Sequence, residues 1–137
     1  MNEWLPKFKG ETLLAKIVEI SEGLDYVSET DAAIEPFDAG KRDAVDARYL
    51  IEKDLQKKEV REILWENFFQ RLTEQRDWFD EDQKQKATRY AELEDLLREN
   101  LLELKVFKIG TIQIDIYVIG FDQERNLLGI KTKAVET

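Results

Sequence analysis

Hydrophobic and polar positions follow two different periods along this chain of 137 residues. Over much of residues 12–104, apolar side chains recur three and four positions apart, which predicts amphipathic helices. Beyond residue 105, apolar and polar residues alternate, which predicts strands with one buried face. A chain that combines both periods favours an α+β domain in which helices pack over a sheet.

The strongest helical pattern lies in residues 82–104. Asp82 and Gln85 have the spacing of a capping box at its start. Its apolar residues then step by 3, 4, 4 and 3 positions, at Tyr90, Leu93, Leu97, Leu101 and Leu104. A shorter helix is predicted over residues 73–79, and a helical turn before it contains Phe68, Phe69 and Leu72.

Two further helices are predicted in the first half of the chain. The first spans residues 12–22, with Thr12 as its N-cap and Gly23 as a left-handed C-terminal cap. Its apolar stripe consists of Leu13, Leu14, Ile17, Val18, Ile20 and Ser21. The second begins at Asp43, with Val45, Tyr49 and Leu55 facing inward and with Lys57 and Lys58 at its C-terminal end.

Strands are predicted mainly in the last third of the chain. Alternation places Ile112, Ile114, Ile116 and Val118 on one buried face. The other predicted strands are residues 33–37, an edge strand that contains Pro36, and residues 106–109 and 127–135, with a turn over 120–126. Residues 60–65 fit either a strand or a helix. The predicted element order is α-β-α-β-α-α-β-β-β.

Composition narrows the possible chemistry. The length predicts a single domain over residues 1–137. The chain contains no cysteine and no histidine, which excludes disulfides, thiol nucleophiles, zinc-thiolate sites and histidine-ligated metals. Carboxylates are therefore the abundant reactive groups, and an enzyme that relies on carboxylates alone is a remote hypothesis.

Charge narrows the possible partners. The net charge of −9 argues against direct binding to nucleic acid or to an anionic membrane, and it favours a basic protein partner. Residues 19–38 contain seven acids and no base, and residues 74–103 contain ten acids and five bases. No secretory signal or membrane-spanning apolar run is present, so a cytoplasmic location is expected.

Two positions stand out as candidates for binding. Trp78 lies among the charged residues Arg76, Asp77 and Asp80, so it is either a packing residue or an interface anchor, and spacing alone favours packing. Thr137 follows the last predicted strand without a spacer, which places its carboxylate near a rigid edge. The acids after Trp78 lack the spacing of a calcium loop and suit a helix N-terminus, so no metal site of the protein's own is expected.

Several segments resemble the nuclease A inhibitor (NuiA) family. The similarity is strong over the last third of the chain and clear in two earlier regions. The matching segments are residues 114–120, 126–137, 21–24, 27–30 and 77–79. Residues 38–58 do not match the family.

The resemblance implies a three-layer α/β/α sandwich of the plant pathogenesis-related-protein type. It also implies a protein that inhibits a sugar-non-specific ββα-metal nuclease by blocking its active site, without enzymatic activity or a cofactor. The family's contact residues correspond to Glu29, Trp78 and the terminal Thr137, which approaches the magnesium ion of the nuclease. A non-inhibitory binding module with another partner is the alternative.

Overall fold

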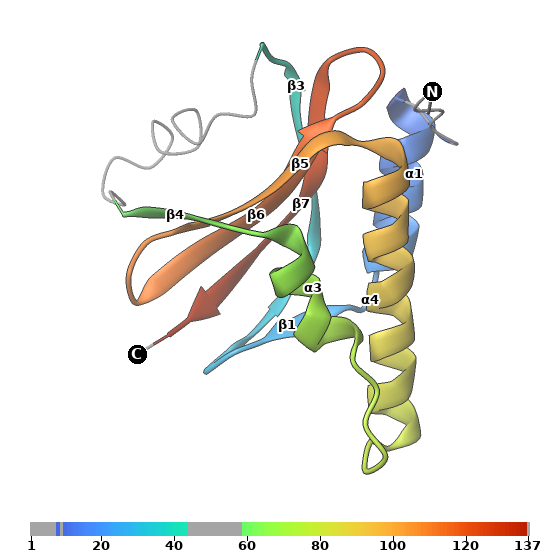
Figure 1. The fold of residues 1–137 in the computed structure, drawn as a ribbon, viewed down its shortest axis with the longest axis vertical. Helices are drawn as coiled ribbons and strands as arrows, with labels where there is room; N and C mark the ends of the chain where they lie inside the picture. Colours follow the sequence, from blue (N-terminus) through green and yellow to red (C-terminus); the bar gives the residue numbers. More distant parts are fainter. Residues whose placement is uncertain (1–7, 9, 44–58, 137) are drawn as a thin grey trace.

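The computed structural model describes residues 8, 10–43 and 59–136, which form an α+β fold (Figure 1). Its main sheet is antiparallel, with five strands in the order β3-β7-β6-β5-β4 among the described residues. The strands are β3 (Glu35–Lys41), β4 (Val60–Ile63), β5 (Leu102–Ile109), β6 (Gln113–Phe121) and β7 (Asn126–Val135). The edge strand predicted over residues 33–37 is confirmed in part, because β3 lies at the edge of the sheet but begins at Glu35, while Ala33 belongs to the separate strand β2. The ambiguous segment after residue 59 begins as a strand, β4.

A second, two-stranded sheet was not predicted from the sequence. It is the hairpin of β1 (Asp25–Val27) and β2 (Asp31–Ala33), which are short, acidic strands without a clear alternating pattern. The hairpin packs beside β7, where the Thr132 hydroxyl donates to the Ala33 carbonyl at 3.0 Å. Because tertiary contacts of this kind hold it in place, local propensity did not predict it.

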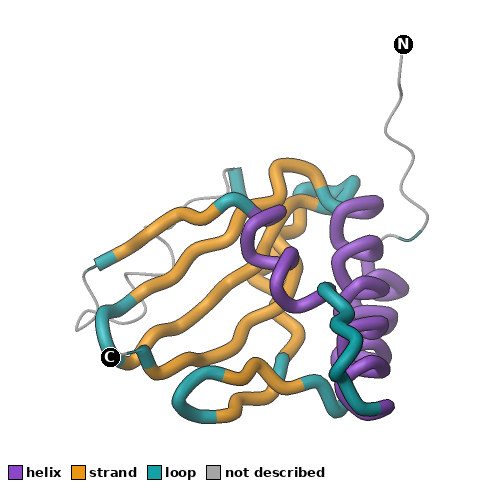
Figure 2. The backbone as a smooth tube through the Cα atoms, turned by 60° about the horizontal axis from the view of Figure 1, so that its bottom comes forward, coloured by secondary structure: helices purple, strands orange, loops and turns teal. Residues whose placement is uncertain are grey.

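Three helices cover one face of the sheet in the described part of the chain (Figures 1 and 2). They are α1 (Gly10–Ser21), α3 (Trp65–Thr73) and α4 (Glu81–Asn100). Tyr90, Leu93, Leu97 and Leu101 are buried as predicted, while Leu104 belongs to β5 and is half-buried. These helices and the strands beneath them share one hydrophobic core.

Several predicted helix boundaries are wrong. Helix α1 already begins at Gly10, so Thr12 is not its N-cap. Gly23 has φ +76°, in agreement with the predicted left-handed cap. The capping box of α4 is formed by Asp80 and Gln83, two residues before the predicted pair. The short helix predicted over residues 73–79 is wrong, because α3 ends at Thr73 and residues 74–80 form a loop.

Two apolar residues are more exposed than predicted, and one turn is shorter. Val18 is 46% exposed because α1 turns Leu13 and Ile17 to the core instead. Ile112 is 56% exposed because it precedes β6, whereas Ile114, Ile116 and Val118 are buried. Strand β6 continues to Phe121, so the predicted turn over 120–126 is shorter.

The opposite face of the sheet carries a second hydrophobic cluster. Its buried members are Phe37, Phe107, Ile109, Ile119, Phe121 and Leu127. A three-layer sandwich needs a helix over this face, and the described elements do not include one there. The helix predicted from Asp43 lies almost wholly in residues 44–58, outside the described residues. The α+β class is therefore established, and the sandwich stays a prediction.

Candidate functional site

The end of β7 is held between two turns from distant parts of the chain. On one side, Ser28 Oγ accepts from Val135 N at 3.0 Å, and Glu29 N donates to the Val135 carbonyl at 3.3 Å. On the other side, Glu136 N donates to the Ile112 carbonyl at 3.0 Å. The last described residues are therefore fixed by backbone and side-chain hydrogen bonds and do not form a loose tail.

The Glu136 side chain adds a further restraint. Its carboxylate accepts from Lys108 Nζ at 2.9 Å, and Arg61 lies 3.8 Å from its second oxygen. The Lys108 side chain is only 14% exposed, so this ion pair is screened less than a surface pair. These contacts join the end of β7 to β5 and β4.

The β1–β2 hairpin presents Glu29 on a well-anchored base. Tyr90 of α4 donates its hydroxyl to the Asp25 carbonyl at 2.5 Å, and the ring of Tyr26 stacks on Phe68 with centroids 5.8 Å apart. Burial and the nearby Asp25 raise the pKa of Tyr90 well above the ordinary tyrosine value, so the hydroxyl stays protonated. Glu29 itself is exposed at the hairpin turn.

Trp78 projects from the loop between α3 and α4 and is 72% exposed. The packing interpretation is therefore wrong for this residue. The Arg76 guanidinium lies 5.2 Å from its ring centroid, and the Phe79 ring meets it edge-on at 6.2 Å. Phe79 N also donates to the Arg76 carbonyl at 3.0 Å, which closes the turn. Together these contacts restrict the exposed indole ring.

The β1–β2 hairpin lies between the end of β7, at the left of the molecule, and the α3–α4 loop, at the right (Figures 1 and 2). The structure thus places Glu29 beside the end of β7, through the hydrogen bond from Glu29 N to the Val135 carbonyl, whereas the loop that carries Trp78 lies on the other side of the hairpin. Thr137 itself lies outside the described residues. Sequence reasoning missed Ser28, Lys108 and Glu136, because their partners are distant in the chain and local spacing carries no signal for them.

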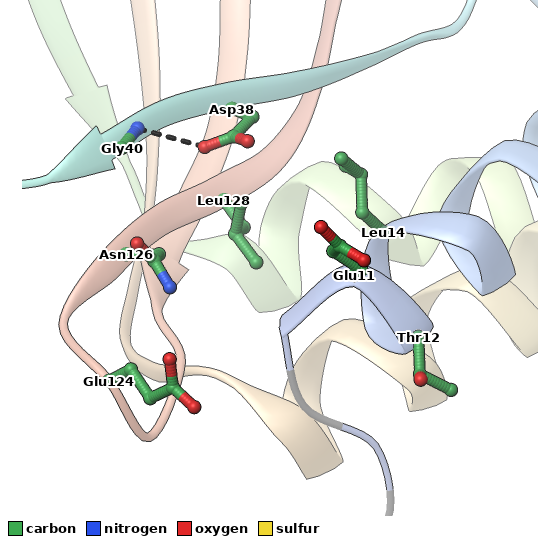
Figure 3. A pocket seen from close by; sticks show the side chains of 8 residues that line it. All are labelled: Glu11, Thr12, Leu14, Asp38, Gly40, Glu124, Asn126 and Leu128. Carbon is green, nitrogen blue, oxygen red and sulfur yellow. Dashed lines mark hydrogen bonds between the residues drawn. The ribbon is translucent and has the colours of Figure 1, made fainter.

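A pocket of about 530 Å³ lies near the start of α1 and the β6–β7 turn, at the top of the molecule in Figure 1 (Figure 3). It is lined by Glu11 of α1, Asp38 of β3 and Glu124 of the β6–β7 turn, together with Leu14 and Leu128. Asp38 accepts a hydrogen bond from Gly40 N at 2.8 Å, which is an ordinary turn contact. Among the described residues, no group of three or more acidic side chains is arranged to hold a metal ion.

The carboxyl group with a raised pKa lies elsewhere. Burial, together with the neighbouring Asp95, raises the pKa of Glu94 on α4, but Glu94 does not line the pocket.

These features define an α+β protein whose candidate site is an exposed, acidic and well-anchored end. The sequence model of the nuclease A inhibitor-like protein family (NuiA) matches residues 11–137. This range includes residues 38–58, so the prediction that this segment does not match the family is wrong. The chain therefore belongs to this family, and the resemblance inferred from its segments is confirmed. A search of curated proteins gave no match. None of the described helices is long and apolar enough to cross a membrane.

Proposed function

We propose that this protein inhibits a sugar-non-specific, metal-dependent ββα-metal nuclease by occupying its active site. Membership of the nuclease A inhibitor-like family over residues 11–137 is the observation that carries the proposal. The hairpin turn with Glu29 supports it because Glu29 N bonds to the Val135 carbonyl at the end of β7, and Trp78 supports it because its ring is exposed to a partner.

The proposed mechanism is competition with the nucleic acid substrate. A nuclease active site is basic and binds phosphodiesters, so the Glu29 carboxylate takes the place of a phosphate oxygen. Trp78 is the apolar anchor, held in advance by Arg76 and Phe79. Thr137, directly after the anchored Glu136, is directed at the magnesium ion of the nuclease, which prefers hard oxygen ligands. The inhibitor itself needs no cofactor.

The test is inhibition of a purified ββα-metal nuclease by the untagged protein. A fluorescent DNA substrate in magnesium buffer reports the rate, and an RNA substrate must give the same inhibition constant. Competition predicts that a higher substrate concentration weakens the inhibition. Failure to inhibit at micromolar protein favours the second hypothesis, a binding module with another partner.

The role of Thr137 is tested with three forms of the chain. The native protein, a form with a C-terminal tag and a form without Thr137 are titrated in the same assay. Both changes are expected to weaken inhibition while the melting temperature stays constant, because a last residue contributes little packing. Equal inhibition constants for all three forms would remove Thr137 from the site.

A further inference from the structure

Two large aliphatic side chains are exposed next to the end of β7. Val27 is 61% exposed and Ile112 is 56% exposed, although most valine and isoleucine side chains of the described core strands are buried. The Ile112 carbonyl accepts the hydrogen bond from Glu136 N, and Val27 directly precedes Ser28, which binds Val135 N. We call Val27 and Ile112 the apolar rim.

The position of the apolar rim is set by the fold. Val27 alternates with buried Tyr26 along β1, so it faces away from the core. Ile112 lies in the turn before β6, on the other side of β7. The two side chains come from opposite sides of the same strand end, 85 residues apart in the sequence. Neither was recognised as a binding residue from local spacing.

The charges around the apolar rim select its partner. Asp25, Glu29 and Asp31 surround Val27 in the sequence, and the whole stretch 19–38 contains no base. A second copy of this chain would place the same acidic surface against itself, and nucleic acid or an anionic membrane would be repelled. A basic protein surface with apolar side chains at its edge satisfies both the charge and the exposed aliphatic groups.

We infer that the apolar rim, Val27 and Ile112, docks against apolar side chains at the mouth of the nuclease active site. This inference rests on the proposed function and extends its contact surface beyond Glu29, Trp78 and Thr137. The rim excludes water around the chain end when the complex forms, which strengthens the polar contacts between the two proteins.

The test uses threonine substitutions, which remove apolar surface and, at valine and isoleucine, keep the β-branched shape. Val27→Thr and Ile112→Thr are each expected to raise the inhibition constant about tenfold. Matched controls are Val18→Thr and Leu102→Thr, at positions 46% and 43% exposed. Leu102 pairs with Phe121, at the far end of β6 from the rim. Both controls should inhibit within about twofold of the parent.

Each result has a defined meaning. If the parent inhibits and both rim variants inhibit equally well, the rim is not part of the interface and only this inference fails. If the parent does not inhibit, the proposed function fails and the rim inference fails with it. A large fall in melting temperature for the rim variants would contradict their assignment as solvent-facing. A parent that sediments as a dimer, with the rim variants monomeric, would identify a second copy as the occupant and overturn the inference.

Discussion

At the scale of single residues, the side chains of the candidate site are exposed but restrained. The exposed ring of Trp78 contacts Arg76 and Phe79, so binding would cost less of its conformational entropy than for a side chain without such contacts. Glu29 is presented by a turn whose backbone bonds to Val135. Restraint of this kind suits a protein that must match a fixed partner surface.

Replacing Trp78 with alanine should separate binding from folding. Because the side chain is 72% exposed, its loss should leave the melting temperature nearly unchanged. The loss of an aromatic anchor should weaken nuclease binding by about 2 kcal/mol or more. Titration of the nuclease and thermal unfolding of the same sample check both outcomes. Trp65→Ala is the control, since Trp65 packs against the core and its loss should lower stability instead. Normal binding by the Trp78 variant would refute the anchor role.

Replacing Tyr90 with phenylalanine should weaken the base of the hairpin. The change keeps the ring but removes the hydrogen bond to the Asp25 carbonyl, which should lower the free energy of unfolding by about 1 kcal/mol.

The raised pKa of Tyr90 also predicts that the stability of the protein depends on pH. Since the folded-state pKa exceeds the unfolded value near 10, the contribution of Tyr90 is complete below about pH 10 and is lost as the pH rises. Urea unfolding at pH 7 and pH 11 should show a steeper alkaline loss in the parent than in the variant.

At the scale of elements, α4 organises the helical face of the sheet. Its start is defined by the capping box of Asp80 and Gln83, with Gln83 N donating to Asp80 Oδ1 at 2.8 Å. Its apolar side chains pack against α1, α3 and the sheet. The same helix carries Tyr90, so it also supports the hairpin that presents Glu29.

Truncating Leu97 should destabilise the fold through α4. Leu97 has no exposed surface, so Leu97→Ala should reduce the free energy of unfolding by about 2–5 kcal/mol. Denaturant unfolding measures this loss. Val18→Ala in α1 is the control, because a side chain 46% exposed should cost far less. An unchanged denaturation midpoint for the Leu97 variant would contradict the core assignment.

At the scale of the whole molecule, acidic residues are concentrated in two segments that are distant in sequence. The β1–β2 hairpin contains Asp25, Glu29 and Asp31, and the α3–α4 loop contains Glu74, Asp77 and Asp80; both segments lie in the lower half of the molecule in Figure 1. With a net charge of −9, this arrangement should attract a basic partner and orient it during encounter.

The association rate with the nuclease should therefore fall as salt increases. Screening shortens the range of surface charges to about 8 Å near physiological ionic strength. Stopped-flow association at several salt concentrations measures the effect. Asp31→Asn, on the hairpin, should reduce the rate more than Glu124→Gln, at the opposite end. A salt-independent rate would exclude steering without excluding inhibition.

Local periodicity was sufficient for the main elements. The step pattern from Tyr90 to Leu101 predicted α4, and alternation after residue 112 predicted β6 and β7, because these signals come from neighbours within one element. Boundaries were less accurate, as the capping box at Asp80 and the loop over 74–80 illustrate. A helix cap or a turn depends on a single side chain, and several neighbouring residues in each of these regions have side chains that could form it.

The sequence by itself determined the α+β class, the acidic charge, the absence of cysteine and histidine chemistry, and the family to which the chain belongs. Only the tertiary structure decided that Trp78 is exposed and that the hairpin forms. It also decided that Ser28 meets Val135, 107 residues away. The physical reason is that periodicity records contacts within an element, whereas the site is made by contacts between elements. The free energy of these contacts between elements depends on the packed core beneath the site and not on the sequence spacing of the contacting residues.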